Sequence, residues 1–145
     1  MTMRYGDGED CQLIATQAVS GTTPIVSRVV DMRDFDDIGL QLITTGTVAG
    51  TWLIEASNDF VAAMNGNAYG SISNGTSPVG TFTDCTAFFT KAAAGTAIAN
   101  PSGAATAQYA KPLHGIRCRA LRITFTPSAG AGNVTCLGNA HCWGG

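Results

Sequence analysis

The sequence is poor in charged residues. They make up 12% of the chain, which is about half the usual fraction for a globular protein. The net charge is −2, and the one basic cluster in the sequence consists of Arg117, Arg119 and Arg122. Three positive charges are few for gripping a phosphate backbone. The composition therefore predicts no nucleic-acid partner.

Long apolar runs are also missing. None approaches the roughly 18–20 residues that a membrane-spanning helix requires, so we expect no membrane partner. The first residues, MTMRYGDGEDCQ, have no apolar segment after their arginine and do not match a secretory signal. These absences predict a protein that is made in a cytoplasm and either stays there or is released by lysis.

Groups suited to catalysis are scarce. The chain has two histidines, His114 and His141, and neither lies in a hydrolase pattern such as G-x-S-x-G. A nucleophilic site needs a nucleophile, a base and an orienting group, and Cys85 with His114 and an aspartate is the remaining combination. A buried thiol accounts for Cys85 more simply. We therefore predict that the chain is not an enzyme and that it has no cofactor.

The five cysteines do not form a recognisable framework. Their odd number and wide spacing argue against a closed set of disulfides, so buried free thiols are expected. A disulfide from Cys142 to Cys136 or Cys118, formed in an oxidising medium, is the alternative. Cys136, His141 and Cys142 are also soft metal ligands, but no CxxC pair is present and adjacent residues do not easily face one ion. We therefore predict no metal site in this region.

An acidic segment, DMRDFDD, is the other place where a cation could bind. Oxygen-rich loops can hold Ca²⁺, yet this segment has no glycine at the bend and no closing glutamate. Aspartate readily bonds its own backbone in turns, so the segment predicts a turn. Its aspartates are Asp31, Asp34, Asp36 and Asp37.

Strand signals recur about every ten residues, whereas helix signals are scarce. Apolar residues alternate with polar ones along several runs, as they do on a half-buried strand. About eight such runs occur without any strand–helix alternation, which predicts an all-β, antiparallel β-sandwich of jelly-roll type. The clearest inward sets are Ile38, Leu40 and Leu42; Trp52, Ile54 and Ala56; and Leu121, Ile123 and Phe125.

A glycine-rich linker, GTVAG, joins the runs 38–45 and 51–57. Glycine accepts the positive φ that short loops require, so we expect these two runs to form an antiparallel hairpin. The second run should end at Ser57-Asn58-Asp59, because such side chains bond nearby backbone and compete with the ladder.

The length suits one domain, 1–145. We expect it to carry an N-terminal arm (1–10), a loop-rich insertion (91–111) and a C-terminal tail (139–145). The insertion is rich in alanine and glycine, and Pro101 limits any helix within it. It is either an arm that a neighbouring subunit orders or a surface loop.

Low charge predicts a surface that is covered by partners, the alternative being a soluble monomer coated with threonine, serine and glycine. Aromatic residues and arginine are enriched at contact surfaces. We therefore name as interface candidates Arg4 and Tyr5 in the arm, Tyr109 in the insertion and Trp143 in the tail.

Two segments of the chain carry a recognisable pattern, which spans residues 25–138 and is weakest over 60–111. The pattern resembles small β-sandwich structural proteins of tailed bacteriophages. Its residues are Gly46, Thr47, Gly50, Thr51, Ser57, Asn58 and Asp59, then Arg119, Arg122, Gly130 and Gly132.

The resemblance implies a virion part without enzymatic activity. A short single domain without coiled-coil heptads favours a capsid decoration (cement) protein over a fibre. Such proteins bind the outer shell, typically as trimers. The expected partners are thus the major capsid protein and other copies of the chain, on the capsid surface, after synthesis in the host bacterial cytoplasm.

Two alternatives remain at this stage. One is a tail, neck or head–tail connector protein of the same fold. The other is a carbohydrate-binding module, because β-sandwiches often bind sugars on exposed aromatic residues. Its candidate residues are Tyr69, Tyr109 and Trp143.

Overall fold

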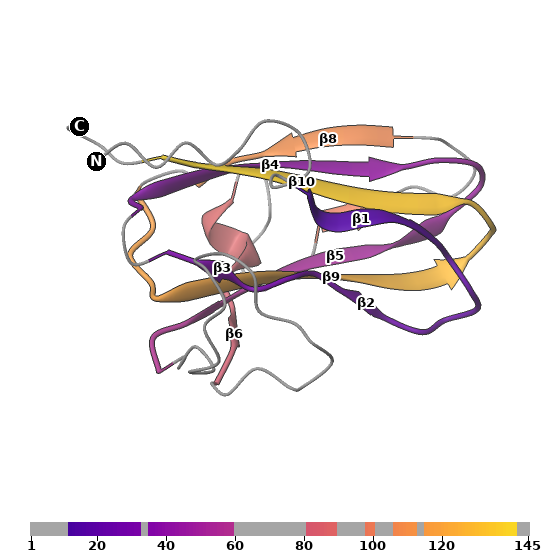
Figure 1. The fold of residues 1–145 in the computed structure, drawn as a ribbon. Coiled ribbons are helices and arrows are strands. Elements are labelled where there is room, and N and C mark those ends of the chain that lie inside the picture. Colours follow the sequence, from indigo (N-terminus) through magenta and orange to yellow (C-terminus); the bar gives the residue numbers. More distant parts are fainter. Residues whose placement is uncertain are drawn as a thin grey trace.

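The computed structural model describes residues 12–32, 35–59, 81–89, 98–100, 106–112 and 115–141. Within these residues the chain forms two packed antiparallel sheets and no α-helix (Figure 1). The predicted all-β sandwich is confirmed. Sheet A has the order β1 (Gln12–Ala18), β10 (Asn133–His141), β4 (Asp37–Thr44) and β8 (Thr106–Ala110).

Sheet B contains the remaining strands. Its order is β2 (Ile25–Val26), β9 (Ala120–Ala129), β5 (Ala49–Ser57) and β6 (Thr83–Asp84). In addition, β3 (Val30–Asp31) pairs with β9, and β7 (Ile98–Asn100) pairs with β5. A 3-10 turn, η2 (Thr86–Phe88), follows β6.

The strand pairing is nested along the chain. The first strand, β1, pairs with the last, β10; β2 and β3 pair with β9; β4 pairs with β8; and β5 pairs with β6 and β7. Because β2 and β3 share one partner and β6 and β7 share another, the ten described strands occupy eight positions. A long hairpin rolled up in this way is the double-sheet jelly roll that the sequence predicted.

The predicted hairpin between β4 and β5 is wrong. The two strands lie in different sheets, with β4 between β10 and β8 and β5 beside β9. Each strand buries one face, as Leu40 and Trp52 show. The same alternation arises whether the second strand continues the sheet or crosses over the core to the opposite one, so the pattern could not distinguish the two.

The β4–β5 and β9–β10 connections both cross between the sheets, and they pair with each other. The backbone N–H of Thr45 donates to the carbonyl of Asn133, and that of Thr47 donates to the carbonyl of Ala131, each at 2.9 Å. Both threonine hydroxyls also accept from backbone N–H groups of the other connection, at 3.1 and 3.2 Å. Gly130 has φ +82°, and a Cβ there would overlap the carbonyl of Thr47. The close approach therefore requires glycine.

The core lies between the two sheets. The predicted inward residues are buried, with Ala56 partly so. The rings of Trp52 and Phe125 lie 4.7 Å apart, centroid to centroid, at 54°. The indole N–H of Trp52 has no hydrogen-bond partner among the described residues. The other largest fully buried side chains are Phe89, Met32, Ile38, Leu40, Leu42, Ile54, Leu121, Ile123, Val30 and Val48.

Thr86 bridges the break between β6 and β7. Those strands pair with opposite ends of β5 and leave Ile54 between them. The Thr86 hydroxyl accepts from the backbone N–H of Ile54 at 2.9 Å and donates to its carbonyl at 3.3 Å. Thr86 is fully buried, so its single hydroxyl replaces a strand partner where water has no access.

Ser27 plays a similar part at the break between β2 and β3. Its hydroxyl accepts from the N–H of Ile123 at 2.8 Å, while its own N–H donates to the carbonyl of Ile123. The same hydroxyl donates to the carbonyl of Arg28 at 2.6 Å. The side chain and backbone of Ser27 thus complete the hydrogen-bond ladder along β9 between β2 and β3.

The segments predicted as loops are partly strands. The insertion 91–111 contains β7 and β8, and β8 forms one edge of sheet A. The tail 139–145 begins as strand, because β10 continues to His141. Small residues such as alanine gave little alternation, and pairing with β4 decides their conformation. The arm 1–10 lies outside the described residues.

The acidic segment connects β3 to β4. Asp37 accepts a hydrogen bond from the backbone N–H of Ile38 at 2.9 Å, and Asp31 is buried. Among the described residues, no group of three potential ligands is placed to hold a metal ion. Asp34 lies outside them.

Thr86→Val should lower the free energy of unfolding by about 2–3 kcal/mol, because it leaves the buried N–H of Ile54 without a partner, while the Ile54 carbonyl still accepts from the N–H of Cys85. Thr86→Ser retains the hydroxyl and should cost only about 1 kcal/mol. Urea unfolding measures both. Equal losses in the two variants would show that the hydroxyl does not carry this role.

Gly130→Ala should cost more than about 2 kcal/mol, since it adds a clash with the β4–β5 connection to the strain of a positive φ. The matched control is Gly21→Ala, where φ is +60° and no atom lies within 4 Å. This variant should lose about 1 kcal/mol. Thermal and urea unfolding of the two variants would refute the pairing of the connections if both lose the same amount.

Candidate functional site

Past Asp37, which lies at one end of β4, the outer face of sheet A carries no charged side chain at its described strand positions, and we call this part of it the neutral face. Residues of β4 and β10 that alternate with buried ones point outward here, as do their neighbours on β1 and β8. Asp37, at the start of β4, is the one aspartate, glutamate, lysine or arginine in the four strands. The neutral face consists of Thr16, Gly39, Gln41, Ile43, Ala107, Tyr109, Thr135, Leu137 and Asn139.

The neutral face is built from uncharged residues on strands that pair in register. Gln41 lies between Leu137 on β10 and Tyr109 on β8. The Tyr109 side chain, 67% exposed, lies over Gly39, where a Cβ would come 2.5 Å from the phenol oxygen. The hydroxyls of Thr16 and Thr135 are hydrogen bonded at 3.0 Å. These positions thus present hydroxyls, amides and apolar groups without an ionic side chain.

The outer face of sheet B differs, because it carries charged side chains, two of which form an ion pair. Arg122 donates to both carboxylate oxygens of Glu55, from Nε at 2.8 Å and from a terminal nitrogen at 3.3 Å. The guanidinium carbon also lies 4.2 Å from the centroid of the Phe82 ring. Arg122, one of the three arginines of the basic cluster, is thus engaged in an ion pair.

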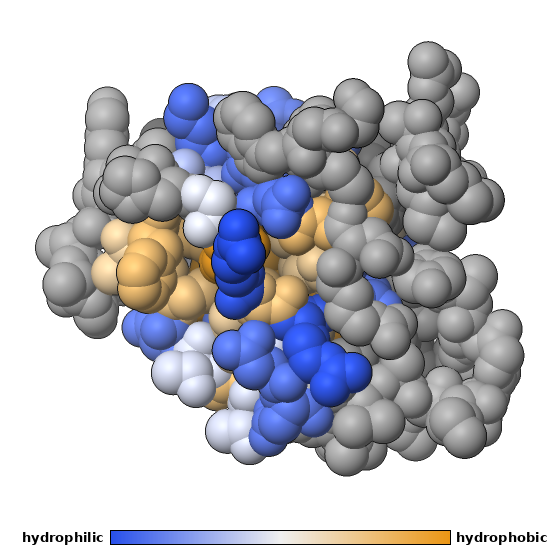
Figure 2. All heavy atoms as spheres, turned by 90° about the vertical axis from the view of Figure 1, so that its left-hand side faces the viewer, coloured by the Kyte–Doolittle hydropathy of each residue, from blue (hydrophilic) through white to orange (hydrophobic). Residues whose placement is uncertain are grey.

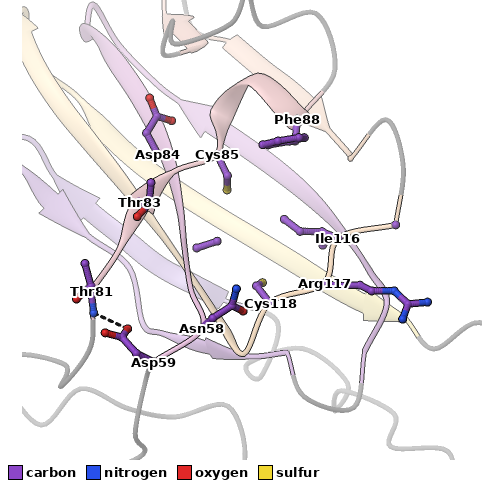
Figure 3. Close-up of a pocket in the computed structure, with 12 residues that line it drawn as sticks. Asn58, Asp59, Thr81, Thr83, Asp84, Cys85, Phe88, Ile116, Arg117 and Cys118 are labelled. Atoms are coloured by element: carbon purple, nitrogen blue, oxygen red, sulfur yellow. Dashed lines mark hydrogen bonds between the residues drawn. The ribbon is translucent and has the colours of Figure 1, made fainter.

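A pocket of about 600 Å³ opens at one end of the sandwich, where β5 ends and β9 begins (Figure 3). That end faces the viewer in Figure 2, where hydrophobic residues form a band between hydrophilic ones. Three segments that are far apart in sequence meet there. The lining residues are Ala56, Asn58, Asp59, Thr81, Thr83, Asp84, Cys85, Phe88, Gly115, Ile116, Arg117 and Cys118.

Two carboxylates of the pocket are held by local hydrogen bonds. One oxygen of Asp59 accepts from the hydroxyl of Ser57 and from the backbone N–H of Thr81, both at 2.7 Å. These bonds lower the pKa of Asp59 from 3.8 to about 2. Asp84 accepts from the backbone N–H of Thr86 at 2.8 Å. The Asp59 carboxylate therefore stays ionised and fixed in position at neutral pH.

Two thiols also line the pocket. Removal from water raises the pKa of Cys85 to about 12, with a smaller effect of nearby Cys118, and raises the pKa of Cys118 to about 11. Burial also raises the pKa of Cys136, which faces the core. A thiolate is the nucleophile and the metal ligand, so protonated thiols suit neither task. These three cysteines are free, which confirms the predicted free thiols for Cys85 and Cys136 as buried and for Cys118 as half-buried.

The predicted interface residues are only partly within the described structure. Tyr109 lies on the neutral face, while Arg4, Tyr5 and Trp143 lie outside the described residues, as do His114, Tyr69 and Cys142. Sequence reasoning overlooked Gln41 and Leu137. The uncharged positions that alternate with the buried residues of 38–45 were the available signal. Phe88, 65% exposed at the pocket, gave no comparable signal.

No known family model, curated protein or solved structure matches this chain. The described residues contain no helix that is both long enough and apolar enough to span a membrane. The resemblance to phage proteins thus depends on the sequence pattern alone.

Asp59→Asn should remove a stability contribution that the wild type loses at acid pH. The folded pKa of Asp59 lies below its ordinary value of 3.8, so the contribution is present above pH 3.8 and is lost as pH falls through about 2. The difference in unfolding free energy between wild type and variant should therefore shrink from about pH 5 to about pH 2. Urea unfolding at each pH measures this difference. An NMR titration of the Asp59 carboxyl with a midpoint near 4 would contradict the prediction.

Proposed function

We propose that this chain is a structural subunit of a virion, and specifically a capsid decoration protein that attaches through its neutral face. The observation that supports this proposal is the absence of charge from the nine described positions of that face. Burying an unpaired charge is costly, and the cores of protein interfaces are depleted in charged residues. A neutral sheet face can be covered by a partner with little desolvation cost.

The size of the face suggests how attachment works. Four strands spaced about 4.8 Å apart and about eight residues long cover about 500 Å². A stable complex buries about 800 Å² on each partner, so one such face gives a weak contact. Firm attachment then requires several contacts at once, as symmetric copies on a shell provide. This agrees with the partners proposed here, namely the major capsid protein and further copies of the chain in a trimer.

The fold does not choose this function by itself. Jelly rolls occur in viral capsid proteins, in lectins and in cupins. Function depends on the site that a fold carries, so the neutral face and the sequence pattern of tailed-phage proteins are the supporting arguments. The capsid surface is the proposed location, and the host bacterial cytoplasm is the proposed place of synthesis.

A tail, neck or connector protein of the same fold would use a similar face. Copy number separates the two roles. A shell role predicts on the order of hundreds of copies per purified particle, and a neck or tail role predicts roughly six or twelve.

Added wild-type protein should raise the melting temperature of capsids that lack it, and Gln41→Lys should abolish the rise by burying a charge at the centre of the neutral face. The matched control is Thr126→Lys, which places the same charge at an exposed position of β9 in sheet B. Differential scanning calorimetry of the particles measures the effect.

This control should stabilise capsids as the wild type does, and both variants should melt alone like the wild type. The decoration role fails if wild-type protein leaves capsid melting unchanged. If both variants lose the rise in capsid melting temperature equally, the docking surface is not the neutral face.

A further inference from the structure

The pocket at the end of the sandwich has the dimensions and lining of a small-ligand site. Its volume of about 600 Å³ falls within the roughly 300–1,000 Å³ of such sites. Ile116 and the thiols of Cys85 and Cys118 form an apolar part of the lining, and the ring of Phe88 stands at its rim (Figure 3). Ala56 is a further apolar lining residue. Phe88 is 65% exposed, so an aromatic surface is open to an incoming ligand.

The charges around the pocket exclude anions. Asp59 and Asp84 are both lining residues, although the carboxylate of Asp84 points away from Cys85 and Ile116 (Figure 3). The guanidinium of Arg117 points away from the pocket, so it does not offset them inside (Figure 3). A phosphate or a carboxylate-bearing ligand would meet like charge there.

The Asp59 carboxylate also excludes a wholly apolar ligand. Such a ligand would strip water from this group and return no hydrogen bond. The Ser57 hydroxyl and the Thr81 N–H both bond to Oδ1 of Asp59, and the Thr81 side chain bonds to the same carboxylate. A carboxylate has about four acceptor sites, so Asp59 can accept a further hydrogen bond from a ligand. The pocket therefore matches a ligand that has hydroxyl donors along one edge and a C–H surface that can lie on an aromatic ring.

We propose that this pocket binds a neutral saccharide of one or two rings, with Phe88 against a sugar face and with Asp59 accepting hydrogen bonds from its hydroxyls. Asn58 and Thr83 add polar groups to the same lining. The site lies apart from the neutral face, so the sugar-binding proposal does not depend on the virion role. In a virion, the site would add sugar binding to the docking function. The aromatic residue involved is none of the three that the sequence suggested for sugar binding.

Saturation-transfer NMR on the full chain would test the site with glucose, galactose, mannose, N-acetylglucosamine, lactose and maltose, each at about 10 mM, which detects millimolar affinity. At least one of these sugars should receive saturation at its ring C–H protons. Phe88→Ala should weaken binding of that sugar about tenfold or more. The matched control is Tyr109→Ala, which removes a similarly exposed aromatic ring from the neutral face and should leave binding unchanged.

A second variant, Asp59→Asn, retains the acceptor oxygen but removes the charge, and it should weaken the same sugar. Glucose 6-phosphate, as an anionic probe, should not bind.

The proposal is overturned if none of the six sugars binds, if Phe88→Ala and Tyr109→Ala behave alike, or if glucose 6-phosphate binds as well as glucose. Butylamine binding that Phe88→Ala weakens, in the absence of sugar binding, would assign the pocket to a cationic ligand. Capsid melting is a separate measurement, so failure of either proposal leaves the other standing.

Discussion

The ladder between β5 and β9 is the constraint on which the rest of the molecule depends. It runs in register from Gly50 opposite Pro127 to Ser57 opposite Ala120 and brings Trp52 onto Phe125 in the core. The strands beyond this pair are interrupted, and buried backbone groups cannot be left without partners. Ser27 and Thr86 meet that requirement with side-chain hydroxyls, so the outer strands can break without opening the core.

The distribution of charge follows from the two sheets. Sheet B has an ion pair between Arg122 and Glu55 on its outer surface, and the guanidinium of Arg122 also lies over the ring of Phe82. Beyond Asp37 at one end of β4, the outward positions of sheet A hold amides, hydroxyls and apolar groups instead. This asymmetry is the basis of the proposed docking function, because a partner can cover one face without desolvating a charge. Symmetric repetition supplies the strength that a single face of this size lacks.

The pocket arises where the sheets stop. After β5 ends at Ser57, the chain continues through Asn58 and Asp59. Thr81, at the start of the segment that leads into β6, is hydrogen bonded to Asp59 there. Hydrogen bonds there fix the carboxylate of Asp59. Phe88 lies in η2, and Ile116 lies in the segment that precedes β9. The scaffold thus places an aromatic ring, fixed acceptors and protonated thiols together at a point remote from the neutral face.

The sequence by itself determined the fold class and the inward faces. Ile38, Leu40 and Leu42 share one face, which a second layer must cover, and the scarcity of helix signals makes that layer another sheet. It predicted β4 and β5 as a hairpin and 91–111 as a loop, because alternation records which side of a strand is buried and not which strand lies beside it. Tertiary structure alone decided that β5 crosses to the other sheet, that β8 completes the neutral face, and that Asp59, Phe88 and Ile116 share one pocket. Those outcomes depend on contacts between residues far apart in the chain, where backbone pairing and packing select the partner and local pattern does not.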